Sequence, residues 1–325
     1  MRTMAARHPM LWFLGRRLGA LLMLLFAVSF IVFSLLYLAP GSPEQVLLGA
    51  RRASPAVIES LREKWHLNES FLGQYWQWLR GVGQLDFGES IRTGQTVVES
   101  ISGRIGVSAF LAVYAFLVAL VFGLPLGILA AVKKTGVVDR GAVGLSVVGV
   151  SAPAFVTGVL FIYVFGVELG WFPVYGAGSG FVDRLWHLTL PALALALSVM
   201  ALIVKITRTA MIEVLGQDYV GFARARGVSD ARVVIRHALR NALVPIVTAA
   251  GTVLVTLIVG AVVVEATFAL PGLGSLLIEA VDSKDLPIMQ GVILLLAALV
   301  ILVNIAVDVA YFLIDPRIRV GLEKV

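Results

Sequence analysis

The sequence predicts an all-α membrane protein with six transmembrane helices, and two observations support this fold class. Of the 325 residues, 59% are hydrophobic and 14% are charged, whereas soluble domains are about 45–50% apolar and about 25% charged. Six segments also supply the roughly 20 apolar residues that a helix needs to cross a bilayer. The chain has no cysteine, which excludes disulfides, cysteine-bound zinc, iron–sulfur clusters and thiol catalysis.

The predicted spans lie, to within a few residues, at 18–39, 106–132, 141–167, 188–207, 243–268 and 288–314. Arg16 and Arg17 precede the first span, as basic residues precede a secretory signal. The apolar run that follows is too long for a signal peptide, and no small-residue cleavage site comes after it. We therefore expect the first span to remain in the protein.

Basic residues are distributed unevenly between the two sides of these spans. The two short loops on one side hold only Arg184 and Lys284. The other side carries Arg2, Arg7, Arg16, Arg17, Lys133, Lys134, Arg140, Lys205, Arg208, Arg224, Arg226, Arg232, Arg236, Arg240, Arg317, Arg319 and Lys324. Because cytoplasmic loops are enriched in Lys and Arg, we expect both termini in the cytoplasm. The net charge of +6 thus reflects topology, and nothing else in the chain favours nucleic-acid binding.

The segment 40–105, between the first two spans, is predicted to be a small external helical insertion. Two stretches, SPAVIESLREKWHL and SFLGQYWQWLRGVG, show apolar residues at helical spacing. Ser54 or Ser70 is a suitable N-cap, and Pro55 suits a first helical turn. The aromatic residues of the second stretch either lie at headgroup depth or pack inside the insertion: Phe71, Tyr75, Trp76 and Trp78.

Two spans combine small residues with proline. The second span contains Gly123, Pro125 and Gly127, and the third contains Ser151 and Pro153. Small residues let helices approach closely, and proline permits a kink. These motifs indicate either close packing or a hinge or cavity wall.

The loop between the fourth and fifth spans, 208–242, is too long for a tight turn and carries helical patterns. Asp218 is expected to cap a short helix that runs to Arg226, with Gly227 in the C′ position, where positive φ is common. The spacing i, i+3, i+4 gives this helix an apolar face made of Tyr219, Phe222 and Ala223.

A second helix, capped by Ser229 or Asp230, is predicted to follow. Its basic stripe consists of residues four apart: Arg232, Arg236 and Arg240. Its apolar residues lie away from the stripe: Val233, Val234, Leu239, Ala242 and Leu243. The residues alone leave two functions open. The basic helix can rest on anionic headgroups, or the short first helix can dock into a cytoplasmic partner that covers its aromatic side chains.

The stretch DYVGFARARGVSDARVVIRHALRNALVP, residues 218–245, resembles the cytoplasmic loop of the membrane permease subunits of binding-protein-dependent ABC importers. Further motifs are similar to the dipeptide and oligopeptide permease branch, in the same order along the chain: LAPGSP, LREKWHLNESFLGQYWQWL, LDFGES, GQTV, FALPGLGSLLIEAVDSKDLPIMQG and DVAYFLIDPRIRV. The resemblance covers nearly the whole chain. The general importer motif begins Glu-Ala-Ala, whereas the matching positions here hold Gly221, Phe222 and Ala223.

This resemblance implies the ABC importer permease fold as one membrane domain over 1–325. Its parts would be the N-terminus with the first span, the external insertion, the permease core with the 208–242 loop, and a cytoplasmic tail: 1–39, 40–105, 106–314 and 315–325. The implied location is the bacterial inner membrane, where the chain would span the lipid several times. The chain would form half of a path for di- or oligopeptides.

The resemblance also implies partners. These are a second homologous permease subunit, an extracytoplasmic substrate-binding protein, and two ATPase subunits, separate or fused. ATP and magnesium would be bound by the ATPases, and the permease itself would bind no cofactor or metal and catalyse no reaction. The sequence agrees, because it contains no GxxxxGK[ST] motif for binding ATP phosphates.

Two groups of residues acquire implied roles. The short helix of the 208–242 loop corresponds to the coupling helix, which sits in a groove of an ATPase subunit: Tyr219, Phe222, Ala223, Arg224, Arg226 and Gly227. The connection between the fifth and sixth spans is a candidate external gate or binding-protein contact, with a plain structural connection as the alternative: Pro271, Gly272, Gly274, Asp282 and Asp285.

Other functions compete with this one. The same architecture can import nickel, glutathione or haem. An ion-driven secondary transporter would need ionisable groups near mid-membrane, but Lys205, Glu265 and Asp308 all lie toward span ends, where capping or snorkelling explains them. A membrane enzyme is disfavoured, because the chain contains no HExxH or GxSxG motif.

Overall fold

The computed structural model describes residues 9–38, 54–133 and 152–314, with single residues at 48, 136, 141 and 144. Within these ranges five helices are long and apolar enough to cross a membrane, which confirms an all-α membrane protein. The third predicted span is described mainly from Ala154 to Glu168, as a shorter apolar helical stretch. Most of its first part lies outside the described residues.

The five long helices are α2 (Pro9–Leu38), α6 (Val97–Val132), α9 (Gly180–Leu215), α12 (Arg240–Thr267) and α14 (Leu286–Ile314). The shorter elements are α4 (Pro55–Lys64), α5 (Phe71–Gly83), α8 (Ala154–Phe161), the π-helix η1 (Ile162–Glu168), α10 (Asp218–Ala225), α11 (Asp230–Arg232), the π-helix η2 (Val233–Leu239) and α13 (Leu273–Ser283). Two helices, α4 and α5, therefore form within the segment 40–105, where helical spacing predicted them.

Some helices extend well beyond their apolar segments, and α6 shows why. It begins at Val97, ahead of the expected start at 106, because Thr96 and Glu99 form a capping box. The Thr96 hydroxyl accepts the Glu99 N–H at 3.2 Å, and the Glu99 carboxylate accepts the Thr96 N–H at 3.2 Å. These two bonds satisfy backbone donors that would otherwise leave the helix end without partners.

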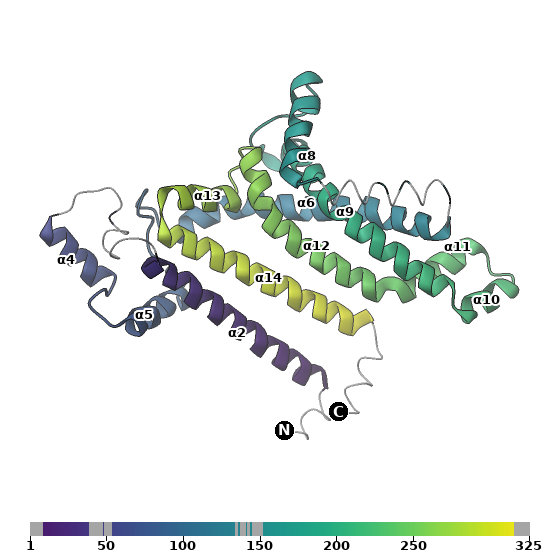
Figure 1. Ribbon diagram of the computed structural model, residues 1–325, viewed down its shortest axis with the longest axis horizontal. Helices are drawn as coiled ribbons and strands as arrows, with labels where there is room; N and C mark the ends of the chain where they lie inside the picture. Colours follow the sequence, from purple (N-terminus) through teal and green to yellow (C-terminus); the bar gives the residue numbers. More distant parts are fainter. Residues whose placement is uncertain are drawn as a thin grey trace.

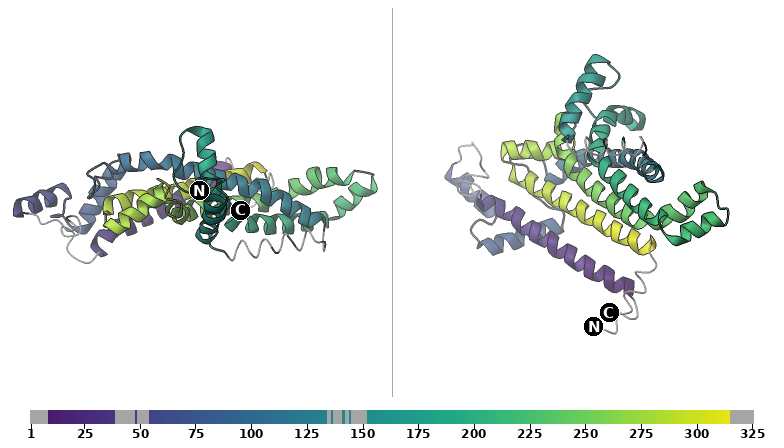
Figure 2. Two further views of the ribbon diagram at one scale, coloured as in Figure 1. Left: turned by 90° about the horizontal axis from the view of Figure 1, so that it is seen from above. Right: turned by 45° about the vertical axis from the view of Figure 1, so that its right-hand side comes forward.

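The long helices pack in the order α2, α14, α12, α9 and α6, and α6 also contacts α12 and α14. Figure 1 shows α4 and α5 at one extremity of the molecule and α10 and α11 at the other, and Figure 2 confirms this in two further views. We call these extremities the α5 end and the α10 end. The chain connecting α12 to α14 through α13 lies toward the α5 end.

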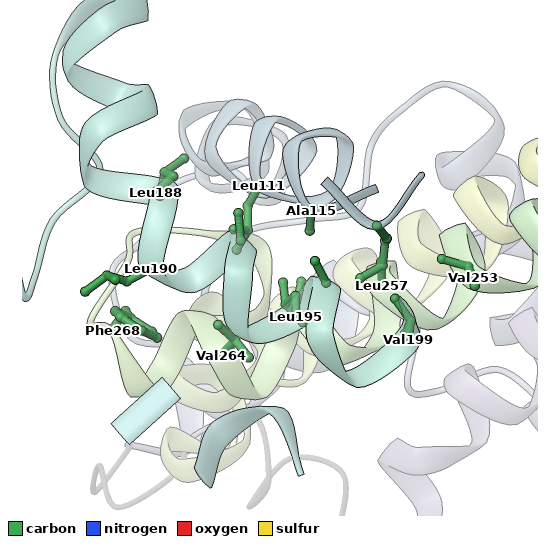
Figure 3. Close-up of a cluster of buried hydrophobic side chains, with 14 of the residues drawn as sticks. Leu111, Ala115, Leu188, Leu190, Leu195, Val199, Val253, Leu257, Val264 and Phe268 are labelled. Carbon is green, nitrogen blue, oxygen red and sulfur yellow. The ribbon is translucent and has the colours of Figure 1, made fainter. Parts of the chain in front are cut away.

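The main core lies where α9 is packed between α6 and α12, and α9 is the most deeply buried of the long helices. Figure 3 shows side chains of these three helices meeting there, among them Leu111, Leu195 and Leu257. A Cβ atom at Gly127 would collide with Thr207, and one at Gly123 would crowd Ile203. For this pair of glycines, close packing is therefore confirmed.

The aromatic residues of α5 pack on α2, not within the insertion itself. The Phe33 ring lies 5.5 Å from Phe71, 5.4 Å from Tyr75 and 5.5 Å from Trp78, measured between ring centroids. Trp76 remains exposed. Phe71, Tyr75 and Trp78 thus pack against α2, and the depth of the four aromatic residues relative to the headgroups stays a prediction. Ser70 is the N-cap of α5, as predicted, and its hydroxyl accepts the Gly73 N–H at 3.3 Å.

The first and last long helices are held together by charge. Arg17 on α2 pairs with Asp308 on α14 through two contacts, Nε to Oδ2 at 2.8 Å and one terminal nitrogen to Oδ1 at 2.9 Å. The Asp308 side chain is buried, whereas Arg17 is half exposed. Near the other end of α2, Gln290 of α14 donates to the Val32 carbonyl at 3.4 Å.

Several residues that entered the sequence analysis lie outside the described ranges. They are Arg2, Arg7, Lys134, Arg140, Ser151, residues 39–43 and the predicted tail 315–325, with Arg317, Arg319 and Lys324.

Candidate functional site

The predicted short helix forms as α10, between α9 and η2. Gln217 occupies the N-cap position, so Asp218 is the first helical residue and not the cap that was predicted. An acidic side chain in the first turn is still favourable, because backbone N–H groups point toward it. At the other end Arg226 is the C-cap and Gly227 has φ +78°, as predicted.

The apolar face of α10 differs from the prediction. The residue buried against the rest of the chain is Val220, which is 0% exposed. Tyr219 is 42% exposed and Phe222 is 70% exposed, while Ala223 is half-buried. One small residue therefore anchors α10, and its largest apolar side chain points away from the body of the chain. A helix that packed only on its own chain would bury Phe222.

Two side-chain contacts fix α10 beside the following helix. The Tyr219 hydroxyl accepts a hydrogen bond from the Asn241 amide at 3.0 Å. Arg224 Nε contacts the Asp230 carboxylate at 3.1 Å, which links the end of α10 to the start of α11. Arg226 and Gly227 are exposed. The implied contact residues thus lie together on α10 and the turn that follows it.

The segment after α10 is joined to the long helices by a buried apolar cluster. This cluster connects η2 and α12 to the ends of α6 and α9, and consists of Ala131, Ala210, Met211, Ala238, Ala242 and Ile246. The basic stripe is exposed, as predicted: Arg232, Arg236 and Arg240. Part of this region is the π-helix η2, whereas the sequence pattern indicated an α-helix. Ser229 occupies the predicted cap position, without a side-chain cap hydrogen bond.

The second group of predicted residues surrounds α13. Pro271 and Asp282 are exposed, whereas Gly272, Gly274 and Asp285 are buried. Pro271 and Asp285 line a pocket of about 370 Å³ between α13 and the beginning of α6. The five residues therefore do not form one continuous surface, and only two of them are available to a partner.

Asp285 joins α13 to the segment that precedes α6. Its carboxylate accepts a short hydrogen bond from the Ser90 hydroxyl and bonds of 3.3 Å from the N–H groups of Ile91 and Arg92. A buried carboxylate with three donors is a structural joint. This geometry favours the structural-connection alternative for Asp285.

The three ionisable residues considered for ion transport lie at the surface, in an ion pair and in a helix cap, respectively. Lys205 is exposed, and Asp308 pairs with Arg17. Glu265 is buried at the end of α12, where its carboxyl oxygen accepts the N–H groups of Gly274 and Ser275 at the start of α13. Capping therefore accounts for Glu265, as the sequence indicated.

Sequence reasoning missed a polar face on α12. Thr248, Thr252 and Thr256 lie four residues apart, so they share one face of the helix, and all three are exposed. Each hydroxyl donates to the carbonyl four residues earlier, at 2.9, 3.1 and 2.9 Å. The oxygen lone pairs therefore remain free to accept hydrogen bonds from outside the chain. The i, i+4 repeat of threonine within an apolar span was the signal that could have revealed this face.

A polar face of this kind contrasts with the exposed face of α2. From Leu18 onward, the large exposed side chains of α2 are apolar and include Leu22, Met23, Phe26 and Ile31. Lipid tails offer no hydrogen bonds, so a surface that faces lipid is expected to resemble α2. The threonine face of α12 is suited to a polar surrounding.

Comparison with known families and proteins gives consistent matches. Residues 123–320 match the family model described as binding-protein-dependent transport system inner membrane component, and residues 10–112 match the model of its N-terminal part. The chain is 39% identical to the di/tripeptide transport system permease protein DppB of Pseudomonas aeruginosa over 333 residues, covering 95% of this chain and 99% of that protein. It is 40% identical to the glutathione transport system permease protein GsiC of Escherichia coli K12 over 311 residues, with the same coverage.

A solved structure shares the fold. A chain of the MetNI methionine ABC transporter in an inward-facing conformation superimposes with a TM-score of 0.58 at 20% sequence identity. The match covers 67% of this chain and 97% of the MetNI chain.

Proposed function

Because this chain belongs to the family of binding-protein-dependent transport system inner membrane components, as a permease subunit of an ABC importer, we propose that its cargo is a di- or oligopeptide. The relatives described above are named for di/tripeptides and for glutathione, and glutathione is itself a short peptide. A short peptide is therefore the cargo class that both names share. Neither name points to nickel or haem.

The proposal assigns the driving force to separate ATPase subunits that dock on α10. The observation that carries this assignment is Phe222, a large aromatic residue that is 70% exposed on a helix held in place by Val220, Tyr219 and Arg224. An exposed aromatic side chain on an ordered helix is typical of an interaction anchor. ATP and magnesium would be bound by these partners, because the chain has no phosphate-binding GxxxxGK[ST] motif.

The test is Phe222→Asp in the complete importer. A charge at this position costs this chain little, because the side chain contacts water or a partner and not the chain's own core. We expect normal membrane insertion and normal amounts of the permease, together with loss of ATPase co-purification and of ATP-dependent peptide uptake. If the variant assembles and transports normally, docking through α10 is wrong.

A matched control places the same charge on the same helix without removing the aromatic anchor. Gln217→Asp puts a carboxylate at the N-cap of α10, where acidic side chains are favourable. This control should retain the ATPases and transport. Phe222→Leu, which keeps apolar area, should lose only part of the association.

The α10 end is then the cytoplasmic side and the α5 end the external side. Most of the basic residues described in the structure support this orientation, because Arg16, Arg17 and the stripe on η2 and α12 lie away from the α5 end. An extracytoplasmic binding protein would deliver the peptide to the α5 end.

The proposed path runs along the threonine face of α12, opposite a second homologous permease subunit. Thr248 and Thr256 are eight residues apart, or roughly 12 Å at 1.5 Å per residue. The hydroxyl oxygens along this face can accept hydrogen bonds from the N–H groups of an extended peptide. A polar lining on one side of an otherwise apolar helix is what a chain needs to pass a hydrogen-bonding cargo through a membrane.

A further inference from the structure

Glu265 lies in the last turn of α12 and is completely buried, with 0% of its surface exposed. Its Oε2 atom accepts the Gly274 N–H at 2.7 Å and the Ser275 N–H at 3.4 Å. These donors belong to the first turn of α13, which has no side-chain cap of its own at Gly272. The carboxyl group of one helix therefore supplies the cap for the next.

The backbone of α13 is folded tightly around this carboxyl group. A Cβ atom at Gly272 would collide with the Glu265 carboxyl, and a Cβ atom at Gly274 would collide with the Val262 Cα. Glycine is therefore required at both positions, because any side chain would clash with these atoms. The first turn of α13 and the last turns of α12 therefore meet in close backbone contact, beside a cavity of about 210 Å³ that Val262, Glu265 and Gly274 also line.

The other side of α13 is fastened to α6. The Leu273 N–H donates to the Ser108 hydroxyl at 2.7 Å, and Arg104 makes two contacts with Glu279, at 3.0 and 3.1 Å. Apolar residues of α13 also pack against Val97 at the start of α6. α13 therefore bridges the end of α12 to the beginning of α6.

The opposite end of α12 is continuous with the docking region. α11, η2 and α12 follow one another without a break from Asp230 to Thr267, a stretch of 38 residues. The segment bends between α11 and α12 (Figure 1) and includes the π-helix η2, and we call the whole bent segment the rod. Asp230 and Asn241, which contact α10, lie in the first third of this segment, and Glu265 lies in its last turn.

We propose that Glu265 is the positioning residue that makes α13 follow the movement of this rod, so that displacement at α10 is delivered to α13 and to the beginning of α6. The inference rests on the proposed function, since it takes α10 to be the point where ATPases act. A packed joint moves as a unit and transmits a small displacement without loss. A neutral side chain that cannot accept the two N–H bonds would let α13 slip relative to α12.

The test uses the complete importer with single spin labels at the two ends of the rod. Since the chain has no cysteine, Ile235→Cys on η2 and Asp282→Cys on α13 each introduce one labelling site in this chain, and both residues are exposed. The nitroxide spectrum is recorded without nucleotide and with ATP and vanadate. In the parent both labels should respond to nucleotide.

In Glu265→Ala the label at 235 should still respond, whereas the label at 282 should lose its response. Peptide transported per ATP hydrolysed should fall severalfold, because movement driven by the ATPases would no longer reach α13. Glu265→Gln keeps the size of the side chain and one acceptor oxygen, so it should fold where the alanine variant does not and should recover part of the response at 282. Glu168→Gln, at an exposed carboxylate on η1 that lies outside this joint, is the matched control and should behave as the parent.

Three results would contradict the proposal or the function on which it rests. If both labels respond in both Glu265 variants and the transport ratio is unchanged, Glu265 does not transmit the movement. If only the label at 235 responds in the parent, α13 does not follow the rod at all. If neither label responds in the parent, the proposed function itself fails, whatever the role of Glu265.

Discussion

The two ends of the Asp230–Thr267 rod are built in opposite ways. At the α10 end, one buried valine and two surface contacts hold a short helix that leaves Phe222 exposed. At the other end of the rod, which meets α13 and which we call the α13 end, the buried Glu265 carboxyl lies against the backbone of α13. Glycine is required there at positions 272 and 274. The comparison separates two kinds of contact. The first is suited to an exchangeable partner, and the second is a permanent joint within the chain.

The sharpest test of this difference adds one methyl group at each end. Gly274→Ala places a Cβ against the backbone of α12, and overpacking of this kind costs about 1–3 kcal/mol. Gly221→Ala meets no atom within 4 Å, and replacing an exposed helical glycine by alanine stabilises a helix by about 0.5–1 kcal/mol. Thermal unfolding of the purified permease in detergent should therefore shift down for the first variant and slightly up for the second. Equal shifts would show that the two ends are packed alike.

A smaller effect is expected at the middle of the rod, where the threonine face lies between the two ends. Thr252→Val keeps the shape of the side chain but removes the hydroxyl. If the oxygen accepts one hydrogen bond from the cargo, uptake at low peptide concentration should fall roughly two- to tenfold, as expected for the loss of about 0.5–1.5 kcal/mol. The initial rate of peptide uptake measures this effect.

Two further variants serve as controls for this measurement. Thr252→Ser restores the hydroxyl and should restore uptake. Thr267→Val removes a hydroxyl with the same intrahelical bond at the end of the same helix, outside the proposed lining, and should leave uptake unchanged. A similar loss in both valine variants would mean that α12 needs its threonines for helix structure and not for cargo.

The smallest effect is expected from the surface ion pairs, which occur at both ends. Arg224→Met breaks the contact with Asp230 at the α10 end, and Arg104→Met breaks the two contacts with Glu279 at the α13 end. Exposed pairs contribute about 0–1 kcal/mol each. Both variants should therefore unfold within a few degrees of the parent, and salt should reduce the difference further. A large decrease in unfolding temperature in Arg104→Met alone would show that the Arg104–Glu279 pair, and not Glu265, stabilises the contact between α13 and its neighbours.

Composition and apolar segment length were sufficient to predict the membrane fold, and helical spacing with Gly227 at the C′ position predicted the short helix before the fifth span. Helix ends were predicted less well, since α6 begins at Val97 through a capping box that lies outside the apolar segment. The pattern T-x-x-E was visible in the sequence, but an apolar window does not detect it.

The candidate site was harder to predict for a different reason. Tyr219, Phe222 and Ala223 share a helical face, yet Val220 is the residue that the neighbouring helix buries. Periodicity shows which residues share a face but not which face a short helix turns toward its own chain. The role of Glu265 depends on where α13 begins and on the close approach of Gly272 and Gly274 to its carboxyl group. No sequence motif indicates this contact, and only the three-dimensional packing reveals it.

The contact between Arg17 and Asp308 has a consequence for how the protein is made. The two residues are 291 positions apart, so α2 is synthesised long before the α14 residue with which it pairs. At about 5–20 residues per second, the delay between their synthesis is roughly 15–60 s. During that time Arg17 is without the carboxylate of Asp308. The contact that holds α2 to α14 therefore forms only after the other long helices have been synthesised.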